Sequence, residues 1–269
     1  MRALYNDERI GAIPAGNYRG GFPWAHVLVG FCVIILIGYQ STNRRFSESL
    51  KRSLLRSYNF FVDLRDLHAV SILHTLILAL AISVTLATLV SSVIYHYRTD
   101  RLADDIATFL FVTDAVKLQF IRACWHPLAG IAGLSALFFV LGALLGIFIK
   151  FLAFFIRARV SGLHAYSVSV WSAAPVVFLS PVAMSLFKIT ENPAYVVPLL
   201  AVILVFLCWT FFRVLKGISV VYDLSPAKTY TAGILLWVLF WGGTYLYYDS
   251  IYAVSAYLKF IAHLSQNLG

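Results

Sequence analysis

The side chains that most often bind metals or transfer protons are few in this 269-residue sequence, and they lie far apart. Its seven histidines show no metal-ligand spacing, and Cys32, Cys124 and Cys208 form no Cys-x-x-Cys pair. The sequence contains no phosphate-binding loop, dinucleotide-binding fingerprint or nucleophile elbow. It therefore predicts no catalytic residue, no cofactor site and no metal site, and we expect a protein that is not an enzyme.

The twelve acidic residues all fall outside the long apolar segments of the chain. Proton relays and ion-coupled carriers place ionisable groups inside the membrane, where such groups mark the transport pathway. The apolar segments here offer serine, threonine and aromatic side chains instead, which argues against a coupled pump or secondary transporter. The acids are Asp7, Glu8, Glu48, Asp63, Asp66, Asp100, Asp104, Asp105, Asp114, Glu191, Asp223 and Asp249.

Asp100, Asp104 and Asp105 form the densest acidic cluster, and two interpretations of it stay open. We favour the start of a helix over Leu102–Phe120, because carboxylates suit the positive end of a helix dipole. The alternative is a cation site, since hard cations bind several carboxylate oxygens. Together with His96, the same acids would form the active site of a membrane enzyme, which is a further functional hypothesis.

The composition indicates a multi-pass membrane protein that consists of α-helices. Hydrophobic residues make up 61% of the chain and charged residues 12%, whereas soluble domains are roughly a quarter charged. We predict a tail (1–21), a single membrane domain (22–248) and a C-terminal amphipathic helix (249–269). Six segments have about the length that a membrane-spanning helix needs. We treat the first of them as an N-terminal span added to a five-span core. We expect Pro175 and Pro181 to bend the fourth. The six are 22–39, 71–95, 128–156, 169–187, 196–215 and 229–248.

The positive residues predict the orientation of these spans. Loops that hold more Lys and Arg usually lie on the cytoplasmic side, and the loops after the first, third and fifth spans carry 12 of the 21 basic residues. We therefore expect these loops inside and both termini outside, in a bacterial or mitochondrial inner membrane. If the first span does not cross, the N-terminus moves inside. The 12 residues are Arg44, Arg45, Lys51, Arg52, Arg56, Arg65, Lys150, Arg157, Arg159, Arg213, Lys216 and Lys228.

Residues Phe46–Leu67 predict an amphipathic helix on the inner surface, with Leu50, Leu54, Tyr58 and Phe61 on its apolar stripe. Basic residues beside the stripe would contact anionic phospholipid. The alternative is a topology signal with no further role. The net charge of +9 does not indicate nucleic-acid binding, because no soluble segment is long enough to form such a module. The predicted lipid contacts are Arg44, Arg45, Lys51, Arg52 and Arg56.

Small residues recur at helical spacing in the second and third spans. In lipid, such residues let helix backbones approach each other closely. We therefore expect these two spans inside the bundle. The predicted packing residues are Ala79, Ser83, Ala87 and Ser91 in the second span, and Gly142 and Gly146 in the third.

Two stretches resemble the Yip1 family of polytopic membrane proteins, mainly over residues 165–245. One runs from Ala165 to Pro175 into the proline-bearing span, and the other is the glycine-bearing loop from Leu215 to Lys228. The resemblance implies a non-enzymatic helical bundle with a five-span core. The long segment between the second and third spans and the extra first span depart from the family pattern.

These observations favour a non-catalytic membrane scaffold or adaptor, an accessory subunit of a larger membrane complex. Its partners would be other integral membrane subunits and anionic phospholipid, and not nucleic acid. The amphipathic segments at Phe46–Leu67, Leu102–Phe120 and the C-terminus motivate this hypothesis, because each exposes an apolar face that needs covering. The alternative is a channel or facilitator for a neutral or lipid-like substrate.

Overall fold

The computed structural model describes residues 23–66, 71–98, 114–156, 160–190, 192–252 and 255. Within these ranges the chain is helical and contains no strand, which confirms the all-α class. The predicted tail (1–21), most of the predicted C-terminal helix (249–269) and the acids Asp100, Asp104 and Asp105 lie outside the described residues.

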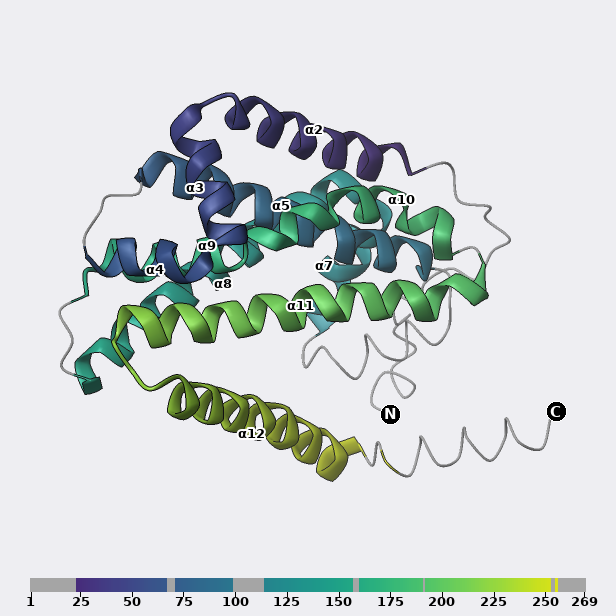
Figure 1. The fold of residues 1–269 in the computed structure, drawn as a ribbon. Coiled ribbons are helices and arrows are strands. Elements are labelled where there is room, and N and C mark those ends of the chain that lie inside the picture. Colours follow the sequence, from purple (N-terminus) through teal and green to yellow (C-terminus); the bar gives the residue numbers. More distant parts are fainter. Residues whose placement is uncertain are drawn as a thin grey trace. The chain divides into compact units, whose positions relative to one another are not determined.

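Figure 1 shows the described helices in the order in which they follow along the chain. Each of the longer ones is an apolar segment bounded by polar or turn residues, as expected for helices in lipid. They are α2 (Trp24–Ser41), α3 (Arg44–Leu55), α4 (Ser57–Arg65), α5 (Ile72–His96), α7 (Asp114–Trp125), α8 (Pro127–Ile156), α9 (Gly162–Ser172), the 3₁₀ helix η1 (Ala174–Leu179), α10 (Ser180–Thr190), α11 (Pro193–Val221) and α12 (Pro226–Tyr252).

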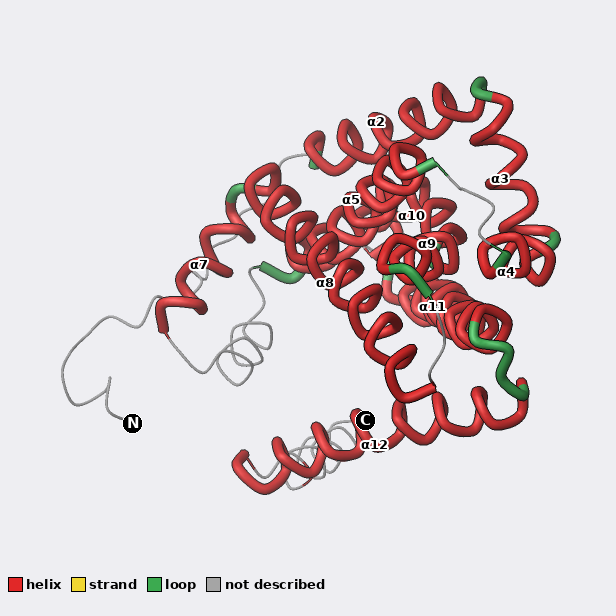
Figure 2. The backbone as a smooth tube through the Cα atoms, turned by 90° about the vertical axis from the view of Figure 1, so that its left-hand side faces the viewer, coloured by secondary structure: helices red, strands yellow, loops and turns green. Residues whose placement is uncertain are grey.

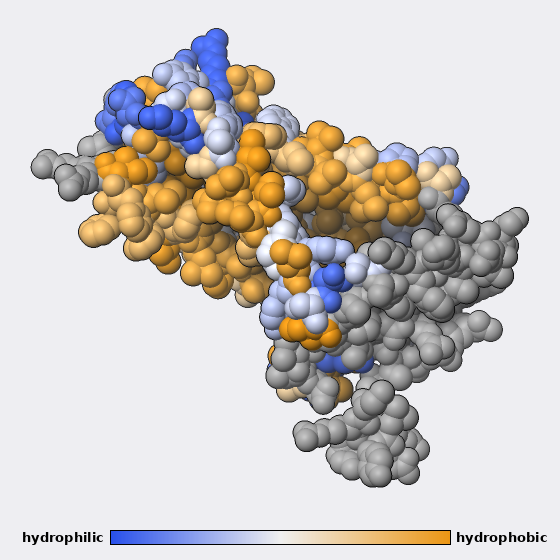
Figure 3. Space-filling view, turned by 90° about the horizontal axis from the view of Figure 1, so that it is seen from below, coloured by the Kyte–Doolittle hydropathy of each residue, from blue (hydrophilic) through white to orange (hydrophobic). Residues whose placement is uncertain are grey.

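Among the described residues, five helical segments are long and apolar enough to cross a membrane, which indicates a multi-pass integral membrane protein. In the coloured part of Figure 3 hydrophobic residues form a broad surface, and hydrophilic residues lie in smaller patches around it. The five are Trp24–Ser41, Ile72–His96, Pro127–Ile156, Gly162–Thr190 and Ala194–Val221. The predicted sixth span, 229–248, lies in α12 and is not among them, because its tyrosines, tryptophans and glycines lower its mean hydropathy. The span count of six therefore stays a prediction.

The chain divides into two compact units, 1–224 and 225–269. In the second unit, α12 begins at Pro226, where the missing N–H of proline is harmless and its fixed φ suits a helix start. The hydroxyls of Thr229 and Thr231 donate to the carbonyls of Ser225 and Ala227 one turn earlier.

In the first unit, α5, α9 and α10 form the centre of the bundle, with α2, α8 and α11 around them (Figure 2). Of the most apolar stretch of α5, 61% is buried inside the bundle, against 6% for α11. This difference follows from side-chain size, because the alanines and serines of α5 allow neighbouring helices to approach closely.

The fourth apolar segment is a broken helix, as its two prolines predict. Helix α9 ends at Ser172, the 3₁₀ helix η1 contains Pro175, and Pro181 lies in the first turn of α10. A proline removes one backbone donor and clashes with the preceding turn, so the α-helical hydrogen bonds cannot continue through Pro175. The segment begins at Gly162 rather than at the predicted residue 169.

The prediction of one amphipathic helix over Phe46–Leu67 is wrong. Arg56 has φ −126° and ψ 51°, so it separates α3 from α4. The break changes which residues of α4 face the bundle: Phe60 and Phe61 are buried, whereas Tyr58, predicted on the apolar stripe, is exposed. The two helices therefore form a cap packed against the bundle, defined as residues 44–65, and not a helix lying free on the membrane surface.

Helix α11 ends in a Schellman motif with Asp223 in the left-handed region, at φ 52°. The N–H of Leu224 donates to the Ser219 carbonyl at 2.9 Å, and that of Asp223 donates to the Val220 carbonyl at 3.3 Å. The pKa of neighbouring Tyr222 is raised to about 12 by burial, and its hydroxyl donates to the Ile149 carbonyl of α8.

We expect the substitution Asp223→Gly to stabilise the protein. Glycine adopts a positive φ without strain, which should raise the free energy of unfolding by up to about 1 kcal/mol. The ion pair that is lost, Arg65–Asp223 at 3.6 Å, joins exposed side chains and contributes little. The midpoint of thermal unfolding in detergent measures the effect. Asp223→Ala is the control and should lower the midpoint; a Gly variant that also melts earlier would refute the explanation.

Candidate functional site

Arg213 is a buried charged residue within the apolar helix α11. The sequence analysis counted it with the basic residues of the loop after the fifth span, whereas it lies inside α11, which continues to Val221. Ionisable residues in membrane-spanning segments are rare, face the bundle interior and often bind backbone carbonyls.

The guanidinium of Arg213 makes four hydrogen bonds to atoms of the described chain, and all of them go to carbonyl or hydroxyl oxygens. Its Nε donates to the Ser172 carbonyl at 3.0 Å. One terminal nitrogen donates to the Ser53 carbonyl at 2.8 Å, the Ser53 hydroxyl at 2.9 Å and the Trp171 carbonyl at 3.1 Å. The Ser53 hydroxyl in turn donates to the Trp171 carbonyl at 3.1 Å. One side chain thus joins α3, α9 and α11.

These carbonyls are available because two helices end here. In an uninterrupted helix the N–H of residue 175 would donate to the Trp171 carbonyl, but Pro175 has no N–H. Ser53 lies in the last turn of α3, where carbonyls have no intrahelical donor. A cation beside two helix C-termini also interacts favourably with both helix dipoles. Arg213 therefore supplies the donors that the proline break and the end of α3 leave missing.

Aromatic rings surround this polar group. The indole of Trp171 is fully buried, and its N–H donates to the Thr75 hydroxyl at 3.0 Å. The rings of Phe46 and Phe60, one from each helix of the cap, lie 6.1 Å and 5.2 Å from the Trp171 ring between centroids. Lys216 adds a hydrogen bond of 3.1 Å to the Ser57 hydroxyl. The cap is thus fixed to the bundle by both polar and apolar contacts.

The five predicted lipid-contact residues are exposed on this cap. Arg44 pairs with Glu48 at 2.8 Å and lowers the pKa of that carboxyl, and Arg52 pairs with Asp63 of α4 at 2.9 Å. Among the described residues, the other three basic side chains form no ion pair, so their charge faces outward. These three are Arg45, Lys51 and Arg56.

The predicted packing residues fall in two environments. Ala79, Ser83, Ala87 and Ser91 are all buried in α5. Gly146 of α8 is buried against Tyr166, where an added Cβ would lie 3.0 Å from the Tyr166 Cα. An added Cβ at Gly142 would meet nothing within 4 Å. Gly142 and Gly146, one turn apart on α8, therefore have different surroundings.

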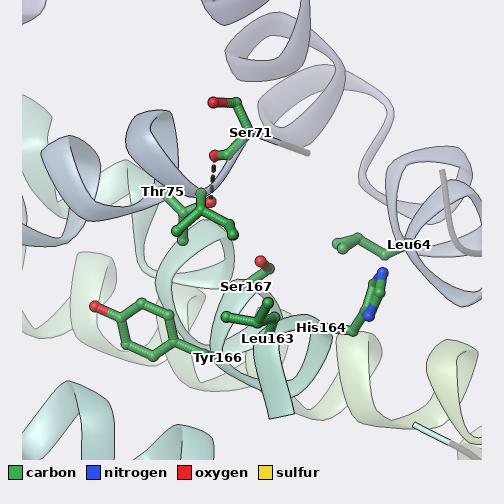
Figure 4. A pocket seen from close by; sticks show the side chains of 8 residues that line it. Leu64, Ser71, Thr75, Leu163, His164, Tyr166 and Ser167 are labelled. Atoms are coloured by element: carbon green, nitrogen blue, oxygen red, sulfur yellow. Dashed lines mark hydrogen bonds between the residues drawn. The ribbon is translucent and has the colours of Figure 1, made fainter. Parts of the chain in front are cut away.

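Two cavities lie along α5 and α9. The end cavity, about 310 Å³, lies at the start of both helices and is lined by Leu64, Ser71, Ile72, Thr75, Leu163, His164, Tyr166 and Ser167 (Figure 4). The middle cavity, about 230 Å³, lies between α5, α8, α9 and α11. Tyr166 lines both cavities. The hydroxyls of Tyr166 and Thr210, which lines the middle cavity, are buried without a hydrogen-bond partner among the described residues.

The described histidines serve internal contacts or lie apart. His26 is buried in α2 and shares a 3.0 Å hydrogen bond with Ser91, which joins α2 to α5. His74 packs against the Phe46 ring. His164 bonds the Ser161 hydroxyl next to the end cavity. Within the described ranges, no three His, Cys, Asp or Glu residues are grouped as metal ligands.

The Arg213 contacts were missed by sequence reasoning, although a signal was present. An arginine inside an otherwise apolar helix that follows a proline-broken span needs acceptors, and a proline break frees carbonyls. No protein family, curated protein or solved structure matches the chain.

Proposed function

We propose that the protein is a non-catalytic membrane scaffold, an accessory subunit that binds other integral membrane proteins. The observation that carries this proposal is the cap formed by residues 44–65. Buried contacts with Trp171 and Arg213 hold the cap in place, while basic side chains of α3 and of the junction with α4 point outward. A rigid, charged surface on a helical bundle suits recognition of a partner with complementary charge.

Anionic phospholipid is the second partner that we propose for this surface. Basic residues close to an anionic membrane surface contribute about 1 kcal/mol each, and salt weakens the interaction. A bacterial or mitochondrial inner membrane, with the cap on the inner side, remains our proposal for the location. The alternative function, a facilitator for a lipid-like substrate, is favoured by the middle cavity, which lies at mid-length of α5 and α8.

Purification in mild detergent after chemical cross-linking tests the accessory role. We expect a membrane protein to co-purify with the wild-type chain at a fixed stoichiometry. The variant Lys51→Gln/Arg56→Gln should lose most of that partner, because it removes two outward charges of the cap. The control Arg122→Gln/Lys228→Gln removes two exposed charges elsewhere and should retain the partner. A monodisperse monomer without a partner, or equal loss in both variants, would contradict the proposal.

A further inference from the structure

Two large apolar side chains of the cap are exposed, at the place where its two helices meet. Leu55, the last residue of α3, is 84% exposed, and Tyr58 in the first turn of α4 is 58% exposed. They flank the break at Arg56, and we call residues 51–59 the corner of the cap. Exposed apolar side chains rimmed by polar residues mark sites that contact a protein, a ligand or a membrane.

The contacts of α4 with α11 give the level of the corner along the bundle. The Lys216 ammonium donates to the Ser57 hydroxyl at 3.1 Å at the start of α4, and Arg65 in its last turn pairs with Asp223. The two helices therefore run in the same direction, and the corner lies level with Lys216. Since α11 ends at Val221 and each helical residue adds about 1.5 Å, the corner lies about 8 Å before that end.

This level corresponds to the boundary between the hydrocarbon and the headgroups of a bilayer. Helix α11 has 29 residues and is about 44 Å long, whereas the hydrocarbon core is about 30 Å thick. The excess, shared between both ends, places about 7 Å of α11 in each headgroup region. Lipid covers most of α11, because only 6% of its most apolar stretch is buried inside the bundle. Helix α4 lies against α11 at the outer edge of the first unit (Figure 2), so the corner is within reach of the same lipid.

Positive charge surrounds the two apolar side chains. Lys51 lies one turn before Leu55 on the same face of α3, and Arg56 is the next residue. In the part of the chain that the structure describes, Lys51 and Arg56 form no ion pair, and the two acids of the cap already pair with Arg44 and Arg52. Leucine and tyrosine beside unpaired basic residues are typical of segments that lie in the interface of an anionic membrane.

We propose that the corner is an interfacial anchor that inserts into one leaflet of the bilayer. The side chains of Leu55 and Tyr58 lie among the first acyl-chain segments, while Lys51 and Arg56 bind the phosphates of anionic phospholipids. The hydrogen bonds of Arg213 hold the cap on the bundle and so keep the corner at this depth. The inference rests on the lipid contact proposed above and deepens it, because it adds the apolar residues and the depth of insertion.

Fluorescence quenching in lipid vesicles tests the depth of the corner. One environment-sensitive fluorophore is attached at Leu55→Cys, at Tyr58→Cys or at the control Asp66→Cys, in the full chain with its three native cysteines replaced by alanine. Asp66 is exposed next to Arg65, level with Asp223 and past the end of α11. We expect phospholipids brominated near the start of the acyl chain to quench the two corner labels several-fold more than the control label. Aqueous iodide should quench in the opposite order.

Two results of this experiment would overturn the proposal. The first is corner labels that iodide quenches as strongly as the control label, which would place the corner in water. The second is corner labels that neither quencher reaches, which would show that protein covers the corner.

The lipid composition of the vesicles tests the role of the basic residues. At equal fractions in phosphatidylcholine vesicles, brominated phosphatidylglycerol should quench the label at residue 55 more strongly than brominated phosphatidylcholine does. Lys51→Gln/Arg56→Gln should abolish this preference, and the control Arg122→Gln/Lys228→Gln should keep it. A wild-type corner without the preference, or a preference that survives Lys51→Gln/Arg56→Gln, would overturn the proposal. A chain that purifies without a protein partner would contradict the accessory role alone, because these vesicles contain no other protein.

Discussion

Replacing Arg213 with methionine should destabilise the first unit more than any other single change that we consider. Methionine keeps the apolar stem, but the carbonyls of Ser53 and Ser172 lose their guanidinium donors, whereas the Trp171 carbonyl keeps the Ser53 hydroxyl and the Ala173 N–H. With about 1–3 kcal/mol for each buried group left unpaired, we expect a loss of about 2–5 kcal/mol in the free energy of unfolding. Thermal unfolding of the wild type and the variant in the same detergent measures this loss of stability.

Two further variants separate the hydrogen-bonding role of Arg213 from its charge. Arg213→Lys keeps the charge, but one ammonium cannot reproduce the planar fork that reaches two helix ends, so an intermediate loss is expected. Pro175→Ala restores an N–H that can donate to the Trp171 carbonyl. The double variant Arg213→Met/Pro175→Ala should therefore be more stable than additivity predicts. An Arg213→Met protein that unfolds at the wild-type temperature would refute the capping explanation.

The second large effect is expected at Gly146. A Cβ there would lie 3.0 Å from the Cα and 3.2 Å from Cδ2 of Tyr166, and the first of these is backbone that cannot move aside. Gly146→Leu should force α8 and α9 apart and lower the free energy of unfolding by about 3 kcal/mol, at the upper end of the usual effect of overpacking.

Gly142→Leu is the matched comparison for this prediction. It places the same side chain one turn earlier on α8, where an added Cβ meets open space. Its midpoint of thermal unfolding should stay close to that of the wild type. Equal midpoints for the Gly142→Leu and Gly146→Leu proteins would show that the close approach of α8 to Tyr166 does not limit stability.

The positions of most helices could be predicted because segment length, hydropathy and proline act locally within the chain. Length and hydropathy define the membrane helices up to Val221, and Pro175 and Pro181 break the fourth segment wherever it packs. The sixth segment was predicted as a span but is not among the five, because its tyrosines and tryptophans carry polar atoms that lower its mean hydropathy. The break at Arg56 was missed, because no proline or glycine marks it.

Composition, hydropathy and the positions of the prolines were enough to predict a helical membrane protein and the positions of most of its helices. The packing of the helices showed that Arg213 is a buried cap for two helix ends, and that Gly146 touches Tyr166 whereas Gly142 lines a cavity. Hydropathy and proline act within one helix, so their effects can be predicted along the chain. Which donor meets which carbonyl depends on how each helix is rotated and packed against the next, and side chains distant in the chain set that rotation together.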